Sequence, residues 1–311
     1  MQVYASVPAT MADAESLRLA DCIVQLDQWM SKNRLKLNAD KTQLIWLGIR
    51  QQLAKLIVTQ LCLTSSIVEF DSTVTGLGVV LNNWLSMQAQ VAAVCRSCFY
   101  QLHQLRVVQR SLTRDALQSL VQASVHCRLD YCNAILTGAA YGQIRRLQAV
   151  QNAAARLVSD ARRHDHVSPI LRSLCWLPVW RWVTFKSAVT AWKCVNGVAP
   201  TYLRELCVPV EDVCRRPWQR SASTRCILLP RVQTSTGQRS FAYSGPAVWN
   251  SLPPASCENM SLATFKTKLK TYFYWRSQWL SKTTRHCCGV GAVTLHTYLK
   301  SQKFAHIFRE N

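Results

Sequence analysis

Acidic residues are the first place to look for catalytic chemistry in this chain, because it has few of them. Its 311 residues include 16 Asp+Glu against 37 Lys+Arg, a formal net charge of +21. Two-metal phosphoryl chemistry needs at least two carboxylates that converge on ions about 3.5–4 Å apart. The only adjacent acidic pair is Glu211-Asp212, for which a solvated loop is the favoured interpretation. With no Gly-rich phosphate loop and no GxSxG or HExxH motif, the sequence assigns no catalytic residue.

Cysteine and histidine offer three candidate metal sites. Cys95 and Cys98 form a C-x2-C pair with His103 nearby, but a zinc site needs four ligands, usually from two such pairs. Both cysteines also fall on an apolar helical stripe, which favours buried core cysteine over zinc. His164-Asp165-His166 could chelate a metal, although a polar loop at a helix end is favoured, and His286-Cys287-Cys288 is weaker still. The sequence therefore predicts no metal and no cofactor.

Basic and aromatic residues point to a polyanion instead. Rings can stack on bases, and Arg or Lys can neutralise phosphate. Rings and cations interleave at Trp176, Trp180, Arg181, Trp182, Trp192 and Lys193. For the tryptophans a place in the core is the favoured interpretation. For the arginines of 145–163 and 215–239 we adopt polyanion binding, because few acidic residues lie among them.

Composition also bounds the setting in which the protein works. No stretch reaches the roughly 18–20 uninterrupted apolar residues of a membrane span, and no signal peptide is visible at the N-terminus. The 14 cysteines lack the even spacing of a secreted disulfide scaffold. We therefore expect an intracellular protein, nuclear or cytoplasmic, without a membrane partner.

The elements that must position these residues begin with a small mixed region over 1–84. Thr10 or Asp13 opens a predicted helix that closes at Lys32-Asn33-Arg34. Short strands are predicted over 42–47, at 61–63 paired with 67–70, and at 76–81. This part carries almost no net charge, since residues 1–50 hold 6 basic and 5 acidic residues.

From residue 88 to residue 200 the pattern predicts a helical bundle. A first helix has its apolar residues at Val91, Val94, Cys95, Cys98, Phe99, Leu102 and Leu105. Thr113 caps a second, whose inward residues are Leu117, Leu120, Val121 and Val125. A third turns inward Ile144, Leu147, Gln151, Ala154, Leu157 and Val158. A short helix starts at Ser168-Pro169, and another runs over 181–195.

Residues 201–282 form a basic C-terminal region. Prolines spread through 207–258 predict loop and short strand rather than helix, and Ser261 caps a final helix. Residues 283–311 are predicted to be a tail that favours disorder. The fold class is accordingly α+β and mostly α.

One segment resembles a known family. Gln28-Trp29-Met30-Ser31-Lys32-Asn33-Arg34-Leu35-Lys36-Leu37-Asn38-Ala39-Asp40-Lys41-Thr42 is similar to the stretch after the active site in reverse transcriptases of non-LTR retrotransposons of the jockey and CR1 kind. The resemblance continues, in order, through Leu77-Gly78-Val79, Ser111-Leu112-Thr113, Arg128 to Asn133, Leu147 to Leu157, Trp176-Leu177-Pro178-Val179, Ser240-Phe241, Gly245 to Pro253 and Phe265 to Lys270. It covers most of residues 2–275.

The resemblance implies a truncated RNA-directed DNA polymerase. In the family, a catalytic Tyr-Ala-Asp-Asp turn in the palm is closely followed by a stretch like Gln2-Val3-Tyr4-Ala5-Ser6. The catalytic aspartates, the fingers and the endonuclease are therefore expected to be missing. What remains is a partial palm, a helical thumb-like bundle and the basic C-terminal region. Mg²⁺ is expected for the intact family enzyme, and no cofactor for this chain.

The expected function is sequence-independent binding of RNA or DNA through phosphate contacts. By the resemblance, Lys36 and Lys41 belong to the palm segment after the active site. The residues expected to bind nucleic acid are Lys36, Lys41, Arg145, Arg146, Arg162, Arg163, Arg215, Arg216 and Arg220. Two alternatives stay open: a conceptual translation of a decayed element with no selected function, and a genuine polymerase.

Overall fold

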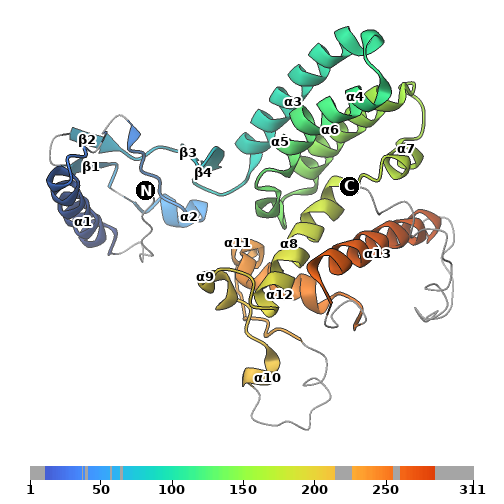
Figure 1. Ribbon diagram of the computed structural model, residues 1–311. Helices are drawn as coiled ribbons and strands as arrows, with labels where there is room; N and C mark the ends of the chain where they lie inside the picture. The colour runs from blue at the N-terminus through green and yellow to red at the C-terminus, as the bar shows by residue number, and fades with distance from the viewer. Residues whose placement is uncertain are drawn as a thin grey trace. The chain divides into compact units, whose positions relative to one another are not determined.

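The structure is a computed structural model (Figure 1). It describes residues 11–36, 38, 41–56, 58–63, 66–213, 226–254 and 260–283. The N-terminal stretch Gln2–Ser6, the arginines at 215, 216, 220 and 225, and all but the first residue of the predicted tail lie outside these ranges. The described residues fall into two compact units, unit 1 within 1–100 and 139–147, and unit 2 within 101–138 and 148–311.

Unit 1 holds the small strands. Helix α1 (Ala12–Lys32) ends at Asn33, as predicted, and the short α2 (Arg50–Leu53) follows. Strands β1 (Gln60–Leu63) and β2 (Ser66–Glu69) pair antiparallel, as do β3 (Thr73–Gly76) and β4 (Val79–Asn82).

Two strand predictions in unit 1 need correction. Residues 76–81 are not one strand but a turn and half of a hairpin. Leu77 (φ 50°) and Gly78 (φ 75°) both adopt the left-handed conformation that tight hairpin turns require. Residues 42–47 form only a single bridge, from Leu44 to Phe70. The ring of Phe70 stacks on Trp46 at 4.9 Å, and the Asp71 amide donates to the Leu44 carbonyl at 2.8 Å, so one stacked ring pair and isolated backbone bonds hold this segment without a ladder.

Helices make up most of the rest of the chain, so the α+β, mostly α fold class is confirmed. They run as α3 (Gln88–Val108), η3 (Gln109–Ser111), α4 (Arg114–Val121), η4 (Gln122–His126), α5 (Cys127–Asp130), η5 (Asn133–Leu136), α6 (Tyr141–Ser159), α7 (Val167–Ser173), α8 (Val179–Val195), α9 (Thr201–Arg204), α10 (Val210–Val213), α11 (Ser235–Arg239), α12 (Phe241–Asn250) and α13 (Leu262–Thr283). The Thr113 hydroxyl accepts from the Ala116 amide, so it caps α4 as predicted. None of the described helices is both long and apolar enough to cross a membrane.

The inward faces of α3 and α4 are narrower than the sequence predicts. In α3 the buried residues Val91, Cys95, Cys98 and Leu102 are spaced alternately four and three residues apart and form a narrow seam. Phe99, next to this seam, is exposed. In α4 to α5 the buried residues are four apart, at Leu117, Val121, Val125 and Leu129, while Leu120 is exposed. Because an α-helix has 3.6 residues per turn, side chains four residues apart move gradually around its surface. The wider π turn of η4 has more residues per turn and returns these buried side chains to one face.

The core of unit 2 is built on α8, which is apolar nearly all round and buried along most of its length. Helices α12 and α13 pack against it (Figure 1). Trp192 of α8, Trp249 of α12 and Phe265 of α13 meet ring to ring, with centroids 5.9 and 6.1 Å apart. Phe265 and Leu269 are completely buried, so the three aromatic rings lie in the core of the unit.

The prediction of loop and strand over 207–258 was wrong for most of the described residues there. α10, α11 and α12 are helices, and α12 contains Gly245 and Pro246. Both are buried, and a Cβ on Gly245 would lie 2.8 Å from the Phe241 ring. Tight packing in the core therefore outweighs the poor helix propensity of these two residues. The prediction holds over 207–209, 226–234 and 251–253, which are not helical and include a bridge between Pro209 and Ile227.

Candidate nucleic-acid interface

The basic residues predicted in unit 1 all have exposed side chains. Lys36 follows α1, and Lys41 lies in a turn where its amide donates to the Asn38 side chain at 3.3 Å. Arg145 and Arg146 lie near the N-terminal end of α6. Arg146 donates to Gln143 one turn earlier, at 3.4 Å. All four cations therefore face solvent.

Arg162 and Arg163 are exposed on an ordered loop that follows α6 in unit 2. The helix ends with Asp160 in the left-handed conformation and with the Ala161 amide donating to the Arg156 carbonyl at 3.1 Å. This is the bond of a Schellman ending. The loop is closed by Asp165, whose carboxylate accepts from the Arg162 amide at 2.7 Å.

A second contact ties this loop to the end of α3. The Gln109 side-chain amide donates to the Leu157 carbonyl at 3.1 Å and to the Asp160 carboxylate at 3.3 Å. Gln109 belongs to η3, so the contact holds η3 against the C-terminal end of α6. Arg110, the next residue, is exposed.

The remaining predicted arginines divide into two groups. Arg215, Arg216 and Arg220 lie outside the described residues. Arg231 is exposed, whereas Arg239 is half-buried and its side chain packs over Gly138. Arg239 therefore contributes to packing within unit 2.

Ion pairing leaves most of this positive charge uncompensated. Within the described ranges the ion pairs are Arg18 with Glu15 at 2.8 Å and Lys186 with Asp130 at 2.7 Å. None of Arg145, Arg146, Arg162 and Arg163 takes part in either. A phosphate backbone can therefore reach these guanidinium groups without displacing a carboxylate.

Two glutamines of α6 position the segment before α8. Gln151 is completely buried, and its side-chain amide donates to the Leu177 carbonyl at 2.9 Å. Gln148 donates to Gln151 and accepts from the Val179 amide, each at 2.9 Å. Val179 opens α8, so Gln148 supplies the acceptor that the first helical amide lacks within its own helix. The motif segments 147–157 and 176–179 therefore meet in the structure.

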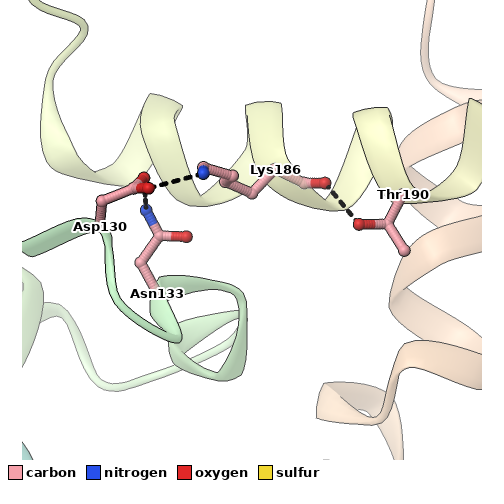
Figure 2. A network of polar contacts seen from close by, with 4 residues as sticks. All are labelled: Asp130, Asn133, Lys186 and Thr190. Atoms are coloured by element: carbon pink, nitrogen blue, oxygen red, sulfur yellow. Dashed lines mark hydrogen bonds and ion pairs between the residues drawn. The ribbon is translucent and has the colours of Figure 1, made fainter. Parts of the chain in front are cut away.

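A polar network joins the segment 128–133 to α8, as Figure 2 shows. Lys186 reaches the Asp130 carboxylate at 2.7 Å, and Asn133 donates to the other oxygen at 3.4 Å. The Lys186 carbonyl accepts from the Thr190 hydroxyl one turn further along the helix. Both charged groups are partly exposed, so the network orients the segment more than it stabilises the unit.

His126 is a buried histidine that packs against two tryptophan rings of unit 2. It ends the π turn η4, and its ring centroid lies 3.9 Å from that of Trp176 and 5.4 Å from that of Trp182. Burial lowers the pKa of His126 to about 4, and the nearby Asp130 carboxylate offsets this only in part. The imidazole is therefore neutral at physiological pH.

The predicted metal candidates take structural places. Cys95 and Cys98 are buried in the α3 seam, as the core interpretation predicts. His164-Asp165-His166 is an exposed loop at a helix end, and Asp165 is used to close that loop. The Glu211-Asp212 pair lies in the short helix α10 rather than in a loop, and the Glu211 side chain is exposed. The cluster at 286–288 lies outside the described residues.

The Mg²⁺ of the intact family enzyme has no matching donor set in the part of the chain that the structure describes. Three or more His, Cys, Asp or Glu side chains nowhere converge there as metal ligands would. Two-metal chemistry needs carboxylates that bridge or flank the ions. The described residues therefore do not provide a ligand set for Mg²⁺.

The tryptophans follow the core prediction only in part. Trp176 and Trp192 are buried and Trp182 is half-buried, but Trp180 is 43% exposed. The Arg181 guanidinium lies 3.7 Å from the Trp180 ring centroid, a close cation–π contact. Because Arg181 itself is buried, this pair belongs to the packing of α8 on α13 rather than to a solvent-facing stacking platform.

No family model, curated protein or solved structure matches this chain in sequence or fold.

Proposed function

We propose that this chain is the post-catalytic portion of a non-LTR retrotransposon reverse transcriptase and that it binds RNA or DNA without sequence preference. Binding occurs by phosphate neutralisation through Arg145, Arg146, Arg162 and Arg163, together with Arg215, Arg216 and Arg220. In this assignment unit 1 includes the palm remnant with Lys36 and Lys41, the helices within 88–200 correspond to the thumb, and residues 201–282 are the basic C-terminal region.

One observation carries the proposal. Arg145, Arg146, Arg162 and Arg163 are all exposed, and none takes part in an ion pair within the described residues. If these arginines served to stabilise the fold through ion pairs, each would lie beside a carboxylate. Exposed guanidinium groups without carboxylate partners are suited to bidentate contact with phosphate.

The placement of the family-like motifs supports the proposal from a second direction. Segments that carry the resemblance are far apart in the sequence but contact each other, at 147–157 with 176–179 and at 128–133 with α8. Residues such as Gln148, Gln151 and Asp130 thus have roles in holding the fold. A set of motifs inherited together is expected to show such mutual contacts.

The experiment is a gel-shift titration of the full chain with random-sequence RNA, single-stranded DNA and duplex DNA at 50 and 200 mM KCl. A protein making about six to ten phosphate contacts loses about 10³–10⁵ in affinity over this range. We expect binding to all three at low salt and a steep loss at high salt. Absence of binding at 50 mM, or binding that is insensitive to salt, contradicts the proposal.

Primer extension on a poly-A template tests the catalytic part of the assignment. We expect no incorporation with Mg²⁺ or Mn²⁺, because the described residues offer no carboxylate cluster for the metals. Metal-dependent extension by the purified chain would identify it as a polymerase and overturn the proposal.

A further inference from the structure

The C-terminal end of α6 brings together arginines from two distant parts of the sequence. Gln109 bridges to Leu157 and Asp160, which holds η3 against the helix end. Arg110 directly follows Gln109, and Arg162 lies two residues after Asp160. Both side chains are exposed, so they flank this one contact.

Two more exposed arginines extend the surface. Arg106 lies in the last turn of α3, four residues before Arg110. Arg163 lies beside Arg162 on the Schellman loop. We call Arg106, Arg110, Arg162 and Arg163 the helix-end surface. All four belong to unit 2.

Two acids, Asp160 and Asp165, lie within this surface and offset part of its charge. Asp160 accepts from the Gln109 side chain, and Asp165 accepts from the Arg162 backbone amide at 2.7 Å. Neither carboxylate forms an ion pair with the four arginines within the described residues, and four cations against two acids leave the surface positive. Arg156 adds a fifth positive charge, and its side chain donates to the Asp165 carbonyl at 3.3 Å.

The loop that carries Arg162 and Arg163 is also fixed by its own bonds. The Ala161 amide bonds to Arg156, and the Asp165 amide bonds to the Arg162 carbonyl at 3.2 Å. Cations on an ordered loop lose less conformational entropy on binding than cations on a mobile chain. This distinguishes the helix-end surface from scattered surface arginines.

We propose that the helix-end surface is the principal phosphate-contact site of unit 2 and takes the backbone of a nucleic acid strand. The inference rests on the proposed function and deepens it by selecting one surface among the exposed cations. Its cations are all arginine, whose planar fork matches two phosphate oxygens at once. Guanidinium contacts to phosphate carry no sequence information, so RNA or DNA of any sequence should bind.

A competing explanation is purely structural. Cations near the C-terminal end of a helix interact favourably with the helix dipole. If that were their whole role, neutralising them would lower the melting temperature and leave nucleic-acid binding unchanged. Binding and stability must therefore be measured on the same variants.

The test compares two triple variants of the full chain with equal charge change. The first is R110Q/R162Q/R163Q, and the matched control is R18Q/R34Q/R204Q, at exposed arginines outside the proposed surface. Fluorescence anisotropy with a labelled single-stranded RNA 20-mer is followed between 50 and 200 mM KCl, and melting curves check folding. A third variant, R110K/R162K/R163K, keeps the charge and checks that the salt slope follows charge. If the triple glutamine variant is unfolded, R163Q alone is compared with R204Q alone.

Each lost phosphate contact lowers the slope of log affinity against log salt by about 0.7 for a single strand. We expect the helix-end variant to lose about 2 from the slope and at least tenfold in affinity at low salt. The control should lose less than 1, and the lysine variant should keep the wild-type slope because each lysine still neutralises a phosphate.

Three results would overturn the inference. Equal losses in the helix-end and control variants would mean that binding follows net charge alone, while the proposed function survives. Displacement of the RNA by poly-glutamate at the same charge concentration would mark a general polyanion surface. Failure of the wild-type chain to bind at 50 mM KCl would remove the proposed function and the inference together.

Discussion

Acidification should destabilise this protein through one buried histidine. His126 is held between Trp176 and Trp182, and burial lowers its pKa from 6.5 to about 4. Between these values the unfolded chain binds a proton at this position that the folded chain does not. The stabilising contribution is therefore complete above about pH 6.5, decreases as the pH falls below that value, and is lost once the pH passes about 4.

The size of the effect follows from the two pKa values. One pKa unit is worth about 1.4 kcal/mol, so the full difference corresponds to about 3 kcal/mol. At pH 4.5 most of this is realised, about 2.5 kcal/mol relative to pH 7.5. That is a large fraction of the roughly 5–15 kcal/mol that stabilises a typical protein.

The assay is urea unfolding followed by tryptophan fluorescence, to which the two rings beside His126 contribute among the 11 tryptophans of the chain. The free energy of unfolding is measured at pH 7.5 and pH 4.5 for the wild type and for His126→Phe, which keeps an aromatic ring but cannot bind a proton. Carboxylates titrate in both proteins and contribute to both losses of stability. The quantity used is therefore the wild-type change in the free energy of unfolding minus the change in His126→Phe. The exposed His103→Gln serves as the control for loss of a histidine.

We expect the pH 7.5 to pH 4.5 loss to be about 2.5 kcal/mol smaller in His126→Phe than in the wild type. His103→Gln should retain the wild-type loss. If His126→Phe loses as much stability on acidification as the wild type, then burial does not keep the imidazole neutral and the reasoning is refuted.

Two further predictions concern the packing of unit 2. Gly138→Ala should destabilise the protein by about 2 kcal/mol or more, since the new Cβ combines a left-handed φ of 67° with a 2.7 Å approach to the Arg239 side chain. Gly197→Ala, with a φ of 72° but open space, should cost only about 1 kcal/mol, and equal losses in urea unfolding would contradict this account. Gln151→Leu should cost about 1–3 kcal/mol, because the Leu177 carbonyl then lacks its partner, and anisotropy should show unchanged RNA binding.

The sequence predicts the regular helices well, because their apolar spacing and end signals act locally. The ends of α1 at Asn33 and α8 at Asn196 and the Thr113 cap of α4 all agree with the structure. The failures occur where long-range packing decides. Gly245 and Pro246 disfavour a helix locally, but contact with the α8 core imposes one.

The candidate site shows the same division. Charge patterning selects the arginines at 145–146 and 162–163, and the structure finds all of them exposed. Charge patterning in the sequence cannot select Arg106 and Arg110. Their place near Arg162 depends on a hydrogen bond between Gln109 and Asp160, which are 51 residues apart. No local pattern in the sequence signals that contact.

The division into two units has a consequence for dissecting the protein. Unit 1 includes residues 139–147, so the boundary is crossed at three points along the chain. Two of these crossings fall inside α3 and α6, each a single helix. No single truncation can therefore release either unit whole, and a fragment ending near residue 100 or starting near 148 would also cut a helix. Deletion mapping would report broken folds as lost function, so point substitutions are the sound way to locate activity in this chain.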